Sequence, residues 1–200
     1  MSQAEINRLE QQIYELTAQL NTLRAEQPGT PVPNYSFATL AGEVTLLDLF
    51  AEHRQLLVIH NMGQACRYCT LWADGFNGLL PHLESVLSVV LVSKDEPALQ
   101  RTFASSRGWR FNLASHRGGA YIQEQTVLAG SDNMPGAIVY ERRGEEILRR
   151  NACVFGPGDL YCAAWPLLAL AGVSQAAWTP QFRYWQQPQQ LDDGGENLLG

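Results

Sequence analysis

Two cysteines lie close together in the stretch HNMGQACRYCTLW, residues 60–72. Cys66 and Cys69 have the spacing of a thiol–disulfide couple and also of half a cysteine zinc site. A third interpretation is a pair of inert buried thiols. The spacing alone does not choose between these three, so the flanking sequence has to be considered.

The flanks predict a strand before the cysteines and a helix that begins at them. QLLVIHNM (55–62) is a dense apolar run typical of a strand buried on both faces. Free N–H groups and the dipole at a helix start stabilise an anion, and the thiolate is the reactive form of cysteine. We therefore expect Cys66 to be a low-pKa thiol at an exposed mouth. Cys69, one turn on, is expected to be more buried and able to close a disulfide with it, and Arg67 adds positive charge.

The whole chain limits the classes of function. Its length of 200 residues favours a single domain. Its net charge is −6, so the charge balance does not indicate binding to nucleic acid. No apolar run reaches membrane-spanning length, and residues 2–27 lack the apolar block of a secretory signal. We expect a cytoplasmic protein, away from membranes. Thiols are kept reduced in that compartment, so a CxxC there favours chemistry over a structural disulfide.

The pattern of elements predicts an α/β domain over residues 28–185, followed by a loose tail over 186–200. The expected order is β-β-α-β-α-β-β-α, which implies a mixed β-sheet flanked by helices. The main expected elements are a stiff linker at 28–34, strands at 55–62 and 88–94, a CxxC helix interrupted near Gly75, Gly78 and Pro81, a helix capped by Asp95, a hairpin of strands 136–142 and 145–151, and a helix at 159–172.

The first 27 residues predict a separate amphipathic helix. Apolar residues recur in alternating steps of three and four, a heptad seam over roughly three repeats; they are Ile6, Leu9, Ile13, Leu16, Leu20 and Leu23. Ser2 and Glu5 form a capping box, and Pro28-Gly29 ends the helix. Two interpretations stay open: a coiled-coil arm that forms a homodimer, or a helix that lies on its own domain.

Other candidate residues carry weaker signals. Cys153 and Cys162 could pair with each other, or complete an all-cysteine zinc site with the CxxC, although their spacing is unusual for one; two buried free thiols are favoured. His60 precedes the CxxC on the predicted core strand. It could act as a base, although a hydrogen-bonded structural histidine is the favoured interpretation. We expect no metal site.

A second motif completes a resemblance to the thioredoxin superfamily. NMPGAIVYERRGEEI (133–147) looks like that superfamily's cis-proline loop, strand and hairpin. The resemblance implies a thioredoxin-like fold in which Pro135 is cis and faces the CxxC, while the Met134 backbone pairs with a substrate chain. Three features are similar to those of the peroxiredoxin and TlpA branch: the P-x-x-x-F that starts at Pro33, a glycine-containing hairpin, and the DLF element before the core strand. The likeness covers roughly residues 33–150.

A longer motif is more specific. CRYCTLWADGFNGLLPHL, with the helix ahead of it, resembles a bacterial family of predicted dithiol-disulfide oxidoreductases of unknown function. The chain departs from better-known relatives at several positions. Arg67-Tyr68 replaces thioredoxin's Gly-Pro, and only Tyr68 is similar to glutaredoxin's Cys-Pro-Tyr-Cys. Gly63 stands where peroxiredoxins carry a hydroxyl that holds the peroxide.

Together these features predict a thiol–disulfide oxidoreductase. Cys66 would attack the disulfide of a protein or small molecule, and Cys69 would resolve the mixed disulfide. Arg67 and Tyr68 are expected to tune the thiol pKa. Electrons would come from an external thiol reductant, with no metal or organic cofactor. The alternatives are a glutathione- or peroxide-linked thiol reductase, and a non-enzymatic binding or assembly module of the same fold.

Overall fold

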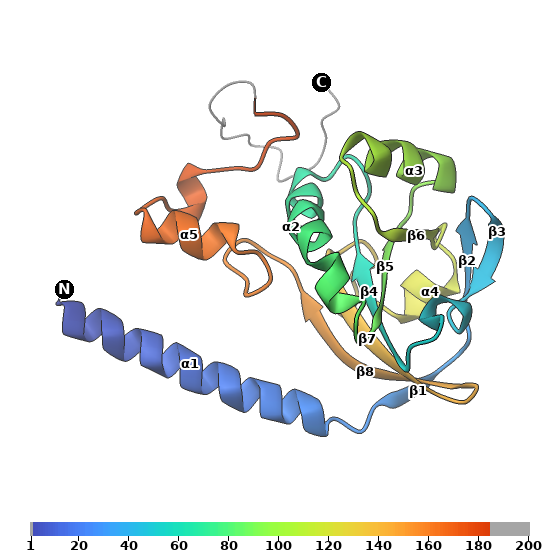
Figure 1. Cartoon of the computed structure of the whole chain (residues 1–200), viewed down its shortest axis with the longest axis horizontal. Coiled ribbons are helices and arrows are strands. Elements are labelled where there is room, and N and C mark those ends of the chain that lie inside the picture. Colours follow the sequence, from blue (N-terminus) through green and yellow to red (C-terminus); the bar gives the residue numbers. More distant parts are fainter. Residues whose placement is uncertain (1, 185–200) are drawn as a thin grey trace.

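The computed structural model describes residues 2–184, so the expected loose tail at 186–200 lies outside the described residues. The expected α/β class is confirmed: a mixed sheet carries helices and is preceded by a long helix, α1 (Figure 1). Within the described chain, no helix is both long and apolar enough to cross a membrane.

The sheet has eight strands in the order β1-β8-β7-β4-β5-β6-β2-β3. The strands are β1 (Thr30–Val32), β2 (Ser36–Thr39), β3 (Gly42–Thr45), β4 (Gln55–His60), β5 (Ser88–Ser93), β6 (Asn112–Ser115), β7 (Gly136–Arg143) and β8 (Glu146–Val154). Only β4, β5 and β6 pair in parallel; the other neighbours are antiparallel. The apolar runs read from the sequence are thus the two central strands, β4 and β5.

Helices and short helical turns connect these strands. They are α1 (Gln3–Glu26), the 3-10 turn η1 (Asp48–Phe50), α2 (Arg67–Leu83), α3 (Pro97–Ser106), α4 (Ala120–Glu124), α5 (Ala164–Leu170) and the 3-10 turn η2 (Gln175–Ala177). The sequence missed α4, and it placed α5 in a longer segment. It also placed the start of α3 at Asp95, whereas Glu96 is the residue before the first turn.

The CxxC helix α2 runs without the expected interruption. Gly75 and Gly78 meet no other atoms within 4 Å of a would-be Cβ, so they sit on an open face of the helix. Pro81 cannot donate to the carbonyl of Asn77. That carbonyl instead accepts a hydrogen bond from Arg110 at 3.3 Å, so the proline leaves no acceptor unused.

Two of the strands were missed because they are short and depend on their partners. β1 lies inside the segment expected to be a linker, where Pro31 pairs opposite Leu148 at the edge of the sheet. Proline is tolerated in an edge strand because one side of that strand needs no donor. β6 has four residues and pairs in parallel with β5.

The core forms on both faces of the sheet. Alternate residues of β4 point to opposite sides, so Val58 joins one apolar cluster and Ile59 the other. The Ile59 cluster includes Trp72 of α2 and Trp165 of α5. The Val58 cluster includes Tyr121 of α4 and residues of η1 and β2. β4 ends at His60 and α2 begins at Arg67, so the start of α2 lies near the end of this central strand.

The N-terminal helix α1 begins and ends close to its predicted limits, Ser2 and Pro28. The Ser2 side chain caps it by accepting from the Glu5 N–H at 3.4 Å, and none of its residues is buried. Within residues 2–184, the hydrogen bonds that tie α1 to the domain start in its last turn: Arg24 donates to the Tyr161 hydroxyl, Asn151 donates to the Arg24 carbonyl, and Arg150 donates to the Ala25 carbonyl. The interpretation that α1 lies along its own domain is wrong for this structure (Figure 1).

Candidate functional site

The loop between β4 and α2 is held at several points. The Asn61 N–H donates to the Val92 carbonyl of β5, which extends the sheet by one residue. The Gly63 N–H donates to Asn61 Oδ1 at 2.8 Å, and the Gln64 N–H donates to Asp95 Oδ2 at 2.7 Å. The loop that presents the cysteines is therefore anchored to the carboxyl ends of the two central strands.

Gly63 is required by this geometry. Its φ is +108°, a backbone conformation that side chains disfavour. A Cβ added here would lie 2.8 Å from Asp95 Oδ1, closer than real Cβ contacts allow. Asp95 cannot withdraw freely, because its carboxylate accepts the Gln64 N–H. This position therefore excludes the hydroxyl-bearing side chain that peroxiredoxins are expected to carry here.

Cys66 caps the start of α2. Its Sγ accepts a hydrogen bond from the Cys69 N–H at 3.1 Å, and its own N–H donates to the Gly63 carbonyl. The Sγ of Cys69 accepts from the Met62 N–H at 3.4 Å. Both cysteines are free thiols in this structure. The predicted strand–CxxC–helix arrangement is therefore present.

The two thiols differ in acidity. The pKa of Cys66 lies below its usual value, first because the Cys69 side chain hydrogen-bonds to it, and further because of the Cys69 and Tyr68 N–H groups and the Arg67 charge; burial opposes this shift. The pKa of Cys69 lies well above its usual value, mainly because of burial and then because of Cys66. Of the two thiols, Cys66 is therefore the one that ionises more readily, and Cys69 the one that more readily keeps its proton.

Cys66 is more enclosed than the sequence predicted. Its exposed fraction is only 3%, the same as that of Cys69, so the expected exposed mouth is wrong. The C-terminal segment packs along the first turns of α2, beside the two cysteines in sequence. Tyr68 lies 6.3 Å from both Trp72 and Trp165, measured between ring centroids, and Trp165 contacts Trp178 in turn. Nothing in the sequence indicated that Tyr68 and Trp165 are in contact, apart from both being aromatic.

Arg67 and Tyr68 lie where tuning residues would be expected. Arg67 is buried, with its guanidinium carbon 6.0 Å from the centroid of the Tyr68 ring. Its charge lowers the pKa of Cys66, although it is not the largest cause. The contribution of Tyr68 comes from its backbone N–H, while its ring packs among the tryptophans.

The predicted cis-proline is wrong. The Met134–Pro135 bond is trans, as are the other peptide bonds of the described chain. In this conformation the Pro135 carbonyl accepts the Phe155 N–H at 2.9 Å, which continues the β7–β8 pairing beyond both strands. Gly136 pairs with His60, so Pro135 lies beside the end of β4 from which the CxxC loop departs. A role of Met134 and Pro135 in binding substrate remains a prediction.

His60 has the surroundings of a structural histidine. Its Nε2 lies 2.7 Å from the Tyr121 hydroxyl, within the Val58 cluster on the sheet face away from α2. Burial, with smaller contributions from His116 and Arg149, lowers its pKa to about 3. The ring is therefore neutral at physiological pH and lies on the other side of the sheet from the cysteines.

The other two cysteines are not assembled with the CxxC. Burial raises the pKa of both Cys153 on β8 and Cys162 before α5. Among residues 2–184, no three or more histidine, cysteine or acidic side chains are grouped so that they could hold a metal ion. The arrangement favours the interpretation of Cys153 and Cys162 as structural thiols.

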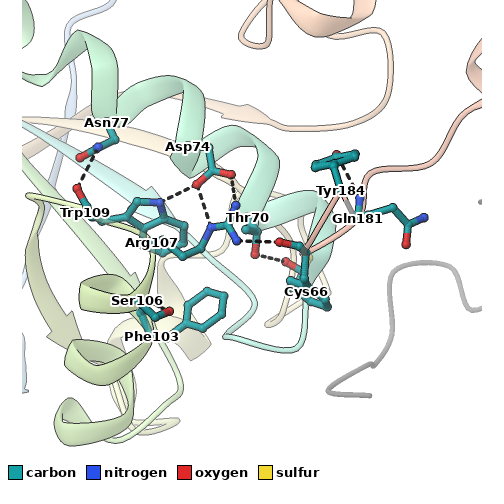
Figure 2. Close-up of polar contacts among 12 residues, drawn as sticks. Cys66, Thr70, Asp74, Asn77, Phe103, Ser106, Arg107, Trp109, Gln181 and Tyr184 are labelled. Atoms are coloured by element: carbon teal, nitrogen blue, oxygen red, sulfur yellow. Dashed lines mark hydrogen bonds and ion pairs between the residues drawn. The ribbon is translucent and has the colours of Figure 1, made fainter. Parts of the chain in front are cut away.

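Polar residues of the long motif hold α2 to the rest of the domain (Figure 2). Asp74 Oδ1 accepts from Arg107 Nε at 2.9 Å and from Trp109 Nε1 at 2.7 Å. Asn77 donates to the Gly108 carbonyl and accepts the Arg110 N–H. Arg107 also donates to the Phe182 carbonyl at 3.0 Å, which fixes the C-terminal segment beside α2. Sequence reasoning missed these roles, because the partners are about 30 or more residues away.

The fold is similar to that of several solved proteins. Peroxiredoxin Q of Xanthomonas campestris, solved as a cysteine-to-serine mutant, has a TM-score of 0.53 and 18% identity, covering 69% of this chain and 89% of its own. A peroxiredoxin-like protein of Aquifex aeolicus has a TM-score of 0.51 and 19% identity, covering 63% and 74%. Reduced Prx3 of Vibrio vulnificus has a TM-score of 0.50 and 13% identity, covering 72% and 97%. At these identities the likeness shows the fold alone.

At the level of sequence, no curated protein matches the chain. A family model described as "Bacterial protein of unknown function (DUF899)" matches residues 3–185, nearly the whole described chain. The match spans α1, the CxxC and the C-terminal segment that packs on α2. The chain thus has the thioredoxin-like fold of the peroxiredoxins and belongs to the DUF899 family of bacterial proteins.

Proposed function

We propose that this protein is a thiol–disulfide oxidoreductase in which Cys66 is the attacking thiol and Cys69 the resolving one. The observation that carries the proposal is the placement of the two thiols, with Cys66 Sγ at the N-terminal end of α2 and Cys69 Sγ one turn further on, beside the Met62 N–H. Cys66 Sγ accepts a hydrogen bond from the Cys69 N–H at the start of α2, while burial favours the protonated form of Cys69. That division suits a nucleophile and a second thiol that acts only later.

The reaction follows from this division. The Cys66 thiolate attacks one sulfur of a disulfide, which forms a mixed disulfide and releases the other sulfur as a thiolate. Cys69 then loses its proton and attacks Cys66 Sγ, which releases the second substrate thiol. The protein is left with a Cys66–Cys69 disulfide and has given two electrons to the substrate. An external thiol reductant would restore the pair.

Residues around the pair would assist in different ways. Arg67 and the backbone of Tyr68 stabilise the Cys66 thiolate. The Met134–Pro135 loop would contact the substrate, as the thioredoxin resemblance implies; its support here is only its place beside the end of β4. A peroxidase of the peroxiredoxin type is not favoured, because Gly63 has no room for the peroxide-holding side chain.

The proposal is tested by trapping. Cys69→Ser treated with glutathione disulfide or 2-hydroxyethyl disulfide, both small enough for an enclosed thiol, should accumulate one adduct at Cys66, visible by intact mass spectrometry and peptide mapping. Cys66→Ser should form no adduct at Cys69, and Cys153→Ser should behave as the unaltered protein does. Failure of Cys69→Ser to form the adduct, or equal labelling of Cys66→Ser, would instead favour the non-enzymatic module.

A further inference from the structure

The helix α1 carries an apolar stripe that its own domain leaves uncovered. The six side chains of the stripe are between 36% and 64% exposed; they are Ile6, Leu9, Ile13, Leu16, Leu20 and Leu23. Helices in proteins are stabilised mainly by packing an amphipathic face against another element. With 24 residues, α1 extends for about 36 Å, so this is a long surface that no other part of residues 2–184 covers.

The residue types along the stripe indicate what covers it. In heptad terms the a positions are Ile6, Ile13 and Leu20, and the d positions are Leu9, Leu16 and Leu23. In parallel coiled coils, β-branched residues at a combined with leucine at d favour two strands over three or four. We propose that a second copy of this chain covers the stripe, and that the two α1 helices form a parallel two-stranded coiled coil.

The rest of the helix surface supports a single narrow partner. Hydrogen bonds between polar side chains four residues apart line its other faces: Gln3 to Asn7, Arg8 to Gln12, and Gln11 to Glu15. A helix that packs on a globular surface needs a wider apolar face than an a/d seam provides. The stripe is therefore suited to one equally narrow helix, and a copy of itself meets that requirement.

The attachment of α1 is compatible with a symmetric pair. Arg24 bonds to Tyr161, and Asn151 holds the carbonyl of Arg24, so the helix leaves the domain from a fixed base. Parallel helices related by a two-fold axis then carry both thioredoxin-like domains at the same end. The described cysteine sites belong to the domains, so the pairing does not require any site residue.

One pair of charges distinguishes the two helix directions. Glu5 stands at a g position and Glu10 at an e position. In a parallel pair each Glu10 faces Glu5 of the other copy, a repulsive contact, whereas in an antiparallel pair it faces the neutral Thr17. Glu10→Lys should therefore lower the dimer dissociation constant roughly three- to thirty-fold if the helices are parallel. An unchanged constant would contradict the parallel direction.

Sedimentation equilibrium on the full chain tests the pairing itself. The unaltered protein should dimerise, and Ile13→Asp, which buries a charge in the central a layer, should raise the dissociation constant roughly 100-fold or more. Gln11→Asp, on the outer face of the same helix, is the matched control and should change it little. Because α1 has no buried residue, circular dichroism should show an intact domain in both variants. A monomeric parent protein, or an undiminished dimer in Ile13→Asp, would overturn the proposal.

Disulfide cross-linking then fixes the register. Ile13→Cys should form a covalent dimer under mild oxidation, because equivalent a positions meet in a parallel pair. The parent protein, with its four native cysteines, is the control and should form none under the same conditions. If Ile13→Cys fails to cross-link while the Ile13→Cys/Leu16→Cys double variant succeeds, the helices run antiparallel and the proposed geometry is wrong.

Discussion

Cys66 and Cys69 have the same side chain and the same exposure, yet their surroundings give them opposite acidity. The difference comes from position in the first turn of α2. Cys66 Sγ lies where free N–H groups converge, and a helix start favours a negative charge there by about 0.3–1 kcal/mol. Cys69 Sγ, one turn further, accepts the Met62 N–H at 3.4 Å, while burial and then the neighbouring Cys66 raise its pKa.

The first prediction is a hierarchy of alkylation. Iodoacetamide should modify Cys66 at a lower pH than the other cysteines, because its pKa is lowered while burial raises that of Cys153 and Cys162. Peptide mapping by mass spectrometry over a pH series gives the rate at each site. Cys153 in the same molecule is the internal control, and equal rates at all four sites would contradict the assigned roles.

Gly63 supplies a second prediction at this scale. Gly63→Ala should lower the free energy of unfolding by about 1–3 kcal/mol, because φ is +108° and the new Cβ meets the Asp95 carboxylate. Gly75→Ala is the matched control: it lies in α2 with open space around it, and should raise stability by about 0.5–1 kcal/mol. Urea unfolding compares the two, and equal effects would show that the loop is not constrained as described.

His60 predicts a pH dependence of stability. Its pKa is about 3 in the folded protein, against an ordinary value of 6.5, so below 6.5 the unfolded chain takes up a proton that the folded protein refuses. Stability should therefore fall as pH drops through this window, by about 2 kcal/mol between roughly pH 7 and pH 4.5 from this residue alone.

His60→Gln should remove this contribution, since glutamine does not titrate. Urea unfolding of both proteins at the two pH values measures it, and the loss on acidification should be smaller in the variant. His82→Gln, on the exposed side of α2, should keep the full loss. Parallel acid profiles for the parent protein and His60→Gln would show that the buried ring does not set this dependence.

At the residue level the sequence predicted where the thiol pair lies in the fold, but not its surroundings. The CxxC, the strand before it and the charge of Arg67 are local features, and each is present. Cys66 is buried, and its neighbour Tyr68 contacts Trp165, about 100 residues away, which no local pattern reveals. The cis form of the Met134–Pro135 bond was expected only from the resemblance to thioredoxin. The bond is trans, and the Pro135 carbonyl accepts the Phe155 N–H.

Among the elements, α2 connects the site with the rest of the domain. Its first turn carries the cysteines, and its middle holds Arg107 and Trp109 through Asp74. Arg107 in turn holds the carbonyl of Phe182. The polar positions of the long motif therefore hold together α2, the loop after α3 and the C-terminal segment.

Asp74→Ala should consequently lower the free energy of unfolding by about 1–3 kcal/mol, because it leaves the Trp109 Nε1 donor and the Arg107 charge without this acceptor. Thermal unfolding measures the loss, with Asp132→Ala in the exposed loop before β7 as control. Combined with Cys69→Ser, the substitution should leave the yield of the trapped adduct unchanged. Loss of the adduct in a folded double variant would place Asp74 in the chemistry.

The elements that the sequence predicted best are those whose structure depends mainly on their own residues. β4 and β5 are apolar runs buried in the centre of the sheet, and α1 has a cap and a clear period. β1 and β6 have three and four residues and exist because β8 and β5 offer partners. Pro81 was read as a helix interruption, since the sequence does not show that Arg110 takes over the carbonyl left by the proline.

On the scale of the whole molecule, α1 and the sheet domain are joined through a small contact. Removing residues 1–21 keeps Arg24 and its bond to Tyr161. We expect the shortened protein to unfold at the same temperature in dilute solution, because none of the α1 side chains is buried, and to lose self-association in light scattering. An unfolded or strongly destabilised product would mean that α1 supports its own domain.

The aromatic cluster beside the cysteines has an optical consequence. Trp72 stacks on Phe155 at 5.6 Å and lies 6.3 Å from Trp165, which lies 5.7 Å from Trp178. Indole rings this close couple their electronic transitions, so they absorb and emit as a group. Tyr68, between the two cysteines in sequence, contacts two of these rings. Closure of a Cys66–Cys69 disulfide would shift that ring and add a quencher next to it, so intrinsic fluorescence and near-ultraviolet circular dichroism would follow the oxidation state of the pair without any added label.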